Sequence, residues 1–136
     1  MNINWKNSKG NFEKEVVENF EKYHGIKFPE KYIEIVKKFN GAYPDKNKFD
    51  LENEKEKVFY KLLNWDLNRK NNLKEMYENH KTNFDGKIIP FGEDPFGNLF
   101  CFNFKKENPS ILYWNHELNE HTLIAENFES FLKMLY

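Results

Sequence analysis

The chain has 136 residues, 39% of them hydrophobic and 18% aromatic, so it is long enough to bury a core and too aromatic for an intrinsically disordered protein. Its 21 basic and 22 acidic residues nearly balance, and Arg69 is the only arginine, which argues against a nucleic-acid-binding protein. Negative charge gathers in residues 107–136, which contain five glutamates and one lysine. This acidic segment suits a basic partner, although a solvated surface is the commoner use of such residues.

The single cysteine, Cys101, cannot form an intrachain disulfide, which fits a reducing compartment. The sequence opens without an apolar run of signal-peptide length, and no stretch approaches the ~18 apolar residues of a membrane span. We therefore expect a cytoplasmic protein with no membrane contact.

Two helices are predicted in the first third of the chain. Residues 12–23 place apolar side chains at helical spacing, with Asn11 as the N-cap and Gly25 just past the end. The apolar positions of this helix are Phe12, Val16, Phe20 and Tyr23. A second helix begins with Pro29 in its first turn and stops at Asn40-Gly41. Its apolar stripe is Tyr32, Ile35, Val36 and Phe39.

The middle of the chain is predicted to hold a connection, a strand and a third helix. Residues 42–57 are polar and charged, which indicates an exposed connection. Residues 58–63 alternate as a strand with Val58, Tyr60 and Leu62 on one face. A helix capped by Asn71 or Asn72 follows, with an apolar stripe of Leu73, Met76, Tyr77 and His80.

Short strands close together in the last third predict an antiparallel meander. They are residues 88–89, which end at Pro90, then 99–104, 111–114 and 122–125. In the second of these, Phe100, Phe102 and Phe104 share one face. A final helix follows Asn127 as N-cap. The order of elements predicts a single α+β domain over 1–136, with its core in about 12–135, in which this sheet packs with N-terminal, middle and C-terminal helices.

No residue pattern demands an enzyme. His116 and His121 flank Glu117 and Glu120, but they lack the i, i+4 helical pairing of metal-binding helices, so no metal site is expected. Cys101 lies within a predicted strand, where a packed thiol is commoner than a nucleophile. No cofactor-binding or phosphate-binding motif is present, and we expect no catalytic residue and no cofactor.

Three segments together resemble one family. The first runs from Phe28-Pro29-Glu30-Lys31-Tyr32 to Phe39-Asn40-Gly41. The second holds Ile88-Ile89-Pro90-Phe91-Gly92, Asp94, Gly97-Asn98 and Phe100-Cys101-Phe102. The third holds Ile111-Leu112-Tyr113-Trp114-Asn115-His116-Glu117 and Phe128-Glu129-Ser130-Phe131-Leu132. In this order and spacing they resemble the SUKH superfamily, in its SMI/KNR-type branch. The chain departs from the family pattern at Ala42 and Asn98, where glycine and aspartate are usual.

The resemblance implies an α+β domain without catalytic residues. Bacterial members are mostly immunity proteins that bind and neutralise a cognate protein toxin, often a nuclease, encoded nearby. Eukaryotic relatives are adaptor-like regulators of cell-wall synthesis, which leaves an intracellular adaptor as the alternative. A small hydrolase using Cys101 or His116 is the second alternative.

A toxin-binding protein needs an exposed contact surface, and we expect it at the ends of the predicted hairpins. Acidic residues there would speed association with a basic nuclease cleft. The expected partner contacts are Glu93, Asp94, Phe96, His116, Glu117 and Glu120.

Overall fold

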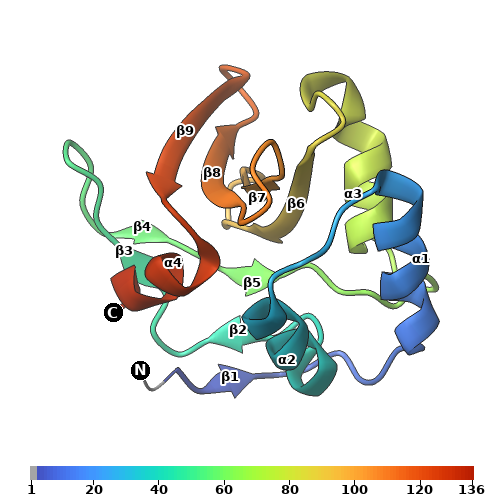
Figure 1. Cartoon of the computed structure of the whole chain (residues 1–136). Coiled ribbons are helices and arrows are strands. Elements are labelled where there is room, and N and C mark those ends of the chain that lie inside the picture. Colours follow the sequence, from blue (N-terminus) through green and yellow to red (C-terminus); the bar gives the residue numbers. More distant parts are fainter. Residues whose placement is uncertain (1–2) are drawn as a thin grey trace.

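The computed structural model describes residues 3–136 and places four α-helices around a five-stranded antiparallel sheet (Figure 1). The helices are α1 (Lys14–His24), α2 (Glu30–Phe39), α3 (Leu73–His80), which continues into the 3-10 turn η1 (Lys81–Asn83), and α4 (Phe128–Met134). The predicted α+β class and its meander are confirmed.

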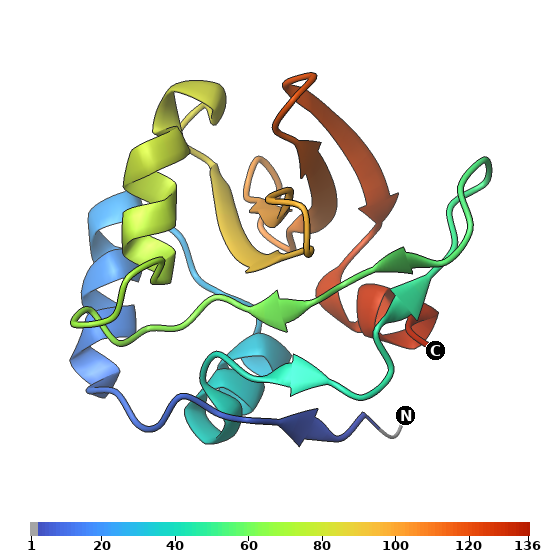
Figure 2. The same ribbon diagram turned by 180° about the vertical axis from the view of Figure 1, so that it is seen from behind.

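The sheet follows the chain from one edge to the other, in the order β5-β6-β7-β8-β9. Its strands are β5 (Lys61–Leu62), β6 (Ile88–Glu93), β7 (Leu99–Asn103), β8 (Ser110–Asn115) and β9 (Glu120–Ala125). Every neighbouring pair is antiparallel. Figure 2 shows the sheet from behind, with α1 and α3 side by side at one end of it.

Strand β6 does not end at Pro90, as predicted, but runs on to Glu93. Pro90 pairs with Cys101 and Gly92 pairs with Phe100, so Phe91 is the extra residue of a bulge. A bulge is a place where a sheet accommodates the missing N–H of proline. Gly92 is also required there, because a Cβ would lie 2.3 Å from Cε1 of Phe59.

The segment expected to be an exposed connection is partly structural. Strand β2 (Tyr43–Pro44) pairs with β1 (Trp5–Lys6), and β3 (Lys48–Phe49) pairs with β4 (Lys57–Val58). The Phe49 ring is fully buried, with its centroid 5.6 Å from that of Phe100. The exposed residues Asp45 and Lys46 and the loop between β3 and β4 match the expectation, and this loop projects from the body as an arm (Figures 1 and 2).

The strand predicted over 58–63 is divided into β4 and β5. Phe59, Leu62 and Leu63 are buried, whereas Tyr60 is 39% exposed, so the predicted alternation was wrong. Between β4 and β5 the chain passes from its pairing with β3 to its pairing with β6. Consecutive residues in this segment therefore contact different parts of the core.

Helix α1 begins later than predicted, after Glu13 rather than Asn11. Val17 and Phe20 are its buried residues, and Tyr23 is 84% exposed, so its place in the predicted stripe was wrong. The other helix boundaries follow local signals. Gly25 ends α1 at φ 65°, and Asn72 and Asn127 cap α3 and α4 by accepting a backbone N–H bond.

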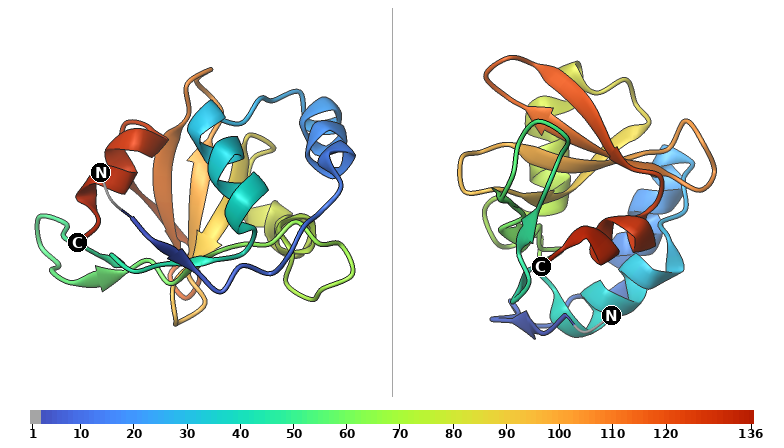
Figure 3. Two further views of the ribbon diagram at one scale, coloured as in Figure 1. Left: turned by 90° about the horizontal axis from the view of Figure 1, so that it is seen from below. Right: turned by 90° about the vertical axis from the view of Figure 1, so that its left-hand side faces the viewer.

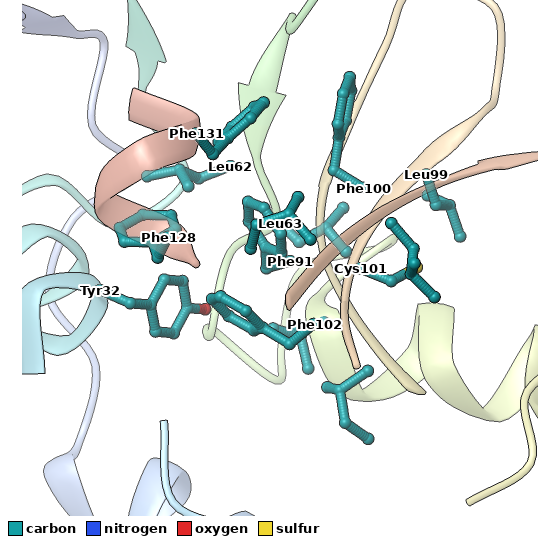
Figure 4. Packing of buried hydrophobic residues seen from close by; sticks show 14 of the residues in the cluster. Tyr32, Leu62, Leu63, Phe91, Leu99, Phe100, Cys101, Phe102, Phe128 and Phe131 are labelled. Atoms are coloured by element: carbon teal, nitrogen blue, oxygen red, sulfur yellow. The ribbon is translucent and has the colours of Figure 1, made fainter. Parts of the chain in front are cut away.

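The core on one face of the sheet is aromatic (Figure 4). The Phe91 and Phe102 rings stack with centroids 4.4 Å apart, and Tyr32 and Phe128 meet Phe102 edge-on or nearly so. Figure 3 shows α2 and α4 on this face. Phe100, Phe102 and Phe104, which are predicted to share one face, are all buried. Cys101 and Leu99, on the opposite face of β7, are also buried, so this strand is covered on both faces.

Because of two half-buried histidines, we expect the free energy of unfolding to fall in mild acid. Burial lowers the pKa of His24 and of His80 below the ordinary 6.5. The unfolded chain therefore binds more protons than the folded one below about pH 6.5, and stability falls as the pH falls through that range. Burial raises the pKa of Glu93 above its ordinary 4.5, so this group binds its proton more readily in the folded chain and acts in the opposite direction.

We expect urea unfolding to show a lower free energy at pH 5.5 than at pH 7.5. The double variant His24→Gln/His80→Gln should lose less stability over the same interval. Equal losses in the two proteins would mean that these histidines do not cause the pH dependence.

Candidate partner-binding site

A buried carboxylate shapes the turn between β6 and β7. Asp94 is 6% exposed and accepts hydrogen bonds from the backbone N–H groups of Phe96 and Asn98, at 2.8 and 2.9 Å. Its other oxygen accepts from the Asn98 side-chain amide at 2.9 Å and from the Tyr113 hydroxyl at 2.5 Å. The exposure expected for Asp94 was therefore wrong, because this carboxylate is turned inward to hold the turn.

Tyr113 supplies the link from this turn to β8. Burial and the hydrogen bond to Asp94 raise the pKa of its hydroxyl, so the hydroxyl stays protonated and donates a hydrogen bond to the carboxylate. The hydroxyl also accepts a bond from the Asn98 amide at 2.9 Å. The network thus holds the β6–β7 turn against strand β8.

His116 joins the β8–β9 turn to the same arrangement. Its backbone N–H donates to Oδ1 of Asn98 at 3.0 Å, and its Nε2 lies 2.9 Å from the Phe96 carbonyl oxygen. Because a carbonyl oxygen only accepts, Nε2 carries the hydrogen. Gly97, at φ 89°, passes beneath the imidazole, where a Cβ would lie 3.3 Å from Nε2. These contacts hold Phe96 at the surface, where it is 76% exposed.

The two turns and the 50–57 arm enclose a groove of about 360 Å³, which we call the hairpin groove. Its charged lining consists of four carboxylates and two lysines, so it is acidic on balance. These residues are Glu54, Lys55, Glu56, Lys57, Asp94 and Glu117. Phe96, Tyr113 and Asn115 line the same groove.

Lys57 lines the hairpin groove and contacts both an aromatic ring and a carboxylate there. Its ammonium is 4.7 Å from the centroid of the Tyr113 ring and 2.8 Å from Oε2 of Glu54. Its side chain is only 19% exposed. A cation between an aromatic face and a carboxylate is the kind of contact that a basic partner would offer.

The predicted contact residues are only partly brought together. Asp94, Phe96 and Glu117 line the hairpin groove, and His116 lies beside it, bonded to the Phe96 carbonyl. Glu93 is half-buried and pairs with Lys61 of β5, with 3.5 Å between Oε1 and Nζ. Glu120 is exposed at the start of β9, opposite Asn115 of β8.

The arm that forms one wall of the groove was not predicted from the sequence. Residues 54–57 alternate in charge, as Glu-Lys-Glu-Lys, between the core residues Phe49 and Phe59. A charged segment with one core aromatic residue before it and one after it indicates a hairpin that is anchored at both ends. The hairpin's place beside the 94–98 turn depends on contacts far apart in sequence.

The chemistry of Cys101 does not suit a nucleophile. Its side chain is fully buried, and burial raises the pKa of the thiol, whereas a nucleophilic cysteine needs an exposed thiol with a lowered pKa. His121 is directed to η1, with Nε2 3.2 Å from the Asn83 carbonyl oxygen. Within residues 3–136, no group of three or more His, Cys, Asp or Glu side chains is placed to hold a metal ion.

A second hollow lies between α1 and α3. Its volume is about 440 Å³, and its lining is mostly apolar, with Phe20 and Trp65 among the lining residues and the exposed Tyr23 and Leu67 beside them. It contains none of the predicted contact residues, and its lining shows no excess of one charge. The hairpin groove is therefore the better candidate. In the described part of the chain, no helix is both long and apolar enough to cross a bilayer.

Comparison with known proteins agrees with the motifs of the sequence. A family model described as SUKH_6, SMI1-KNR4 cell-wall, matches residues 14–132. The SPbeta prophage-derived uncharacterized protein YokK of Bacillus subtilis (strain 168) is 29% identical over 130 residues. The match covers 79% of this chain and 66% of the relative, so the chain spans slightly less than two thirds of that protein.

Proposed function

The chain belongs to the SMI1-KNR4 cell-wall family of SUKH proteins, and from this premise we propose that it is an immunity protein that binds a cognate protein toxin and blocks it by occlusion. In this proposal it acts in the cytoplasm and has no catalytic activity of its own. The observation that carries the proposal is the acidic hairpin groove, with an exposed phenylalanine at its lip.

A rigid acidic groove suits a basic protein surface. Toxins that cleave nucleic acids bind a polyanion, and their active-site clefts are accordingly positively charged. Opposed charges speed diffusional association, and a large exposed aromatic side chain is a frequent anchor of a protein interface. Because the Asp94 network holds the backbone of Phe96 in place before binding, little backbone entropy is lost at this residue on association.

An intracellular adaptor is the second candidate function. The family description names the cell wall, and the resemblance in the sequence motifs extends to adaptor-like regulators of cell-wall synthesis. The groove would then bind a regulatory protein instead of a toxin. A hydrolase is not proposed, since Cys101 is buried with a raised pKa.

Co-expression with a neighbouring toxin tests the first function directly. We expect the chain to rescue cells that express a toxin encoded beside it, and the two proteins to co-purify as a stable complex. Nanomolar affinity, about −12 kcal/mol, is typical of what steric blocking requires. A catalytically inactive toxin variant should still be bound, since occlusion does not depend on toxin activity. If neighbouring toxins are neither bound nor neutralised, the adaptor function replaces the immunity function.

A further inference from the structure

One edge of the five-stranded sheet is open. Among the described residues 3–136, strand β9 pairs only with β8, and its residues 120–123 are exposed. In Figures 1 and 2, β9 forms the border of the sheet, and no strand of the described part of the chain runs along its free side. In an antiparallel edge strand, every second residue turns its N–H and C=O groups away from the sheet, which leaves them free to pair with another strand.

The opposite edge is closed by the chain itself. The backbone N–H of Leu62 in β5 donates to the Ala42 carbonyl oxygen at 3.0 Å, so the segment around β2 occupies that side. Natural edge strands are commonly protected by lysine or proline, and β9 contains neither. Its register shift places Ile124 as an extra residue, which limits the straight part of the edge to residues 120–123.

The charges along this edge select its partner. Glu117 and Glu120 stand at one end of β9, and Glu126 and Glu129 follow its other end, all four exposed. Two copies of β9 paired antiparallel would bring these carboxylates together, which disfavours a dimer through this edge. A partner strand with lysine or arginine at both ends would instead place a positive charge next to the glutamates at each end of β9.

We propose that the free edge of β9 binds an extended, basic strand of the partner protein by β-augmentation. Main-chain hydrogen bonds to residues 120–123 give affinity, and the flanking carboxylates give charge selectivity. Leu123, 64% exposed on one face of the strand, offers an apolar contact beside the partner backbone. This inference rests on the proposed function, because it describes the chemistry of the partner; Glu117 also lines the hairpin groove, so the two surfaces are continuous.

A peptide titration tests the edge without any identified partner. The probe is a capped heptapeptide with two lysines at each end and a Thr-Val-Thr centre, added to the ¹⁵N-labelled full chain up to about 1 mM. We expect chemical-shift changes and slowed amide exchange at residues 120–123. Two control peptides separate the causes. In one, the three central amide nitrogens are methylated, which removes their hydrogen-bond donors; in the other, glutamates replace the lysines.

Each control should bind at least ~10-fold more weakly than the probe. In the protein, Glu120→Gln/Glu126→Gln should weaken binding several-fold, and the matched double variant Glu15→Gln/Glu18→Gln on α1 should not. Undiminished binding of the methylated peptide, shifts confined to the hairpin groove, or no binding would overturn the proposal. Self-association of the chain through β9, seen as sedimentation of a dimer with the same amides protected, would also overturn it in favour of a second copy.

The edge and the proposed function fail in distinguishable ways. If the toxin complex forms and its β9 amides exchange as fast as in the free chain, only the edge proposal is wrong. If the peptide binds β9 but neighbouring toxins are neither bound nor neutralised, the edge stands as a binding site and the immunity function fails.

Discussion

Replacing Trp114 by alanine is expected to lower the free energy of unfolding by about 3–5 kcal/mol. The indole is 2% exposed, with its centroid 5.3 Å from Phe84 and 5.1 Å from His80, so its removal leaves a cavity between β8 and the α3–η1 segment. Its Nε1 also donates to Oδ1 of Asn119 at 2.8 Å, a bond that fixes the β8–β9 turn.

Urea unfolding followed by circular dichroism measures this effect. Two further variants are compared with Trp114→Ala: one removes the hydrogen bond of the indole, and the other changes an exposed residue nearby. Trp114→Phe keeps an aromatic ring and removes the bond to Asn119, so it should cost less than the alanine variant. Glu120→Ala, at an exposed position in the neighbouring strand, should cost under about 0.5 kcal/mol. A loss below about 1 kcal/mol in Trp114→Ala would mean that the ring is not part of the core.

Reversing the charge of the hairpin groove is expected to have the largest effect on function. The triple variant Glu54→Lys/Glu56→Lys/Glu117→Lys changes exposed residues and leaves Asp94 in place, because a change there would disturb the turn itself. Association with a basic toxin should slow by about 10-fold or more, and the difference should shrink as salt is added. Rescue of cells that express the toxin should weaken accordingly.

A matched control separates local charge from net charge. Glu15→Lys/Glu18→Lys/Glu34→Lys changes the net charge equally, at exposed positions of α1 and α2. This variant should keep most of its association rate, since its substitutions lie outside the hairpin groove. Stopped-flow association rates at low and high salt provide the measurement. If the two triple variants slow association equally, the groove is not where the partner binds. A groove variant that is folded and rescues normally would also exclude it.

Phe96→Ala examines the apolar part of the same surface. The ring is 76% exposed, so its removal should change stability by less than about 0.5 kcal/mol. An interface anchor, by contrast, contributes about 2 kcal/mol or more to binding, and the loss falls mainly on the dissociation rate.

The sequence by itself determined the features that depend on neighbours along the chain. Helix ends followed from Gly25, Asn72 and Asn127, because a cap needs only one side chain and the adjacent turn. The meander followed from short strands separated by turn residues. The family followed from motifs that describe the scaffold, such as the buried Phe100 and Phe102.

The tertiary structure alone decided which side chains reach the surface of the site. From the sequence, Asp94 is expected to be an exposed acidic residue in a turn. It is buried because the Tyr113 hydroxyl, nineteen positions away, donates a hydrogen bond to its carboxylate. The arm at 50–57 reads as a connection, and it becomes a groove wall because Phe49 is anchored against Phe100 and Phe131. Both outcomes depend on contacts between distant segments, and local spacing carries no information about which segments meet.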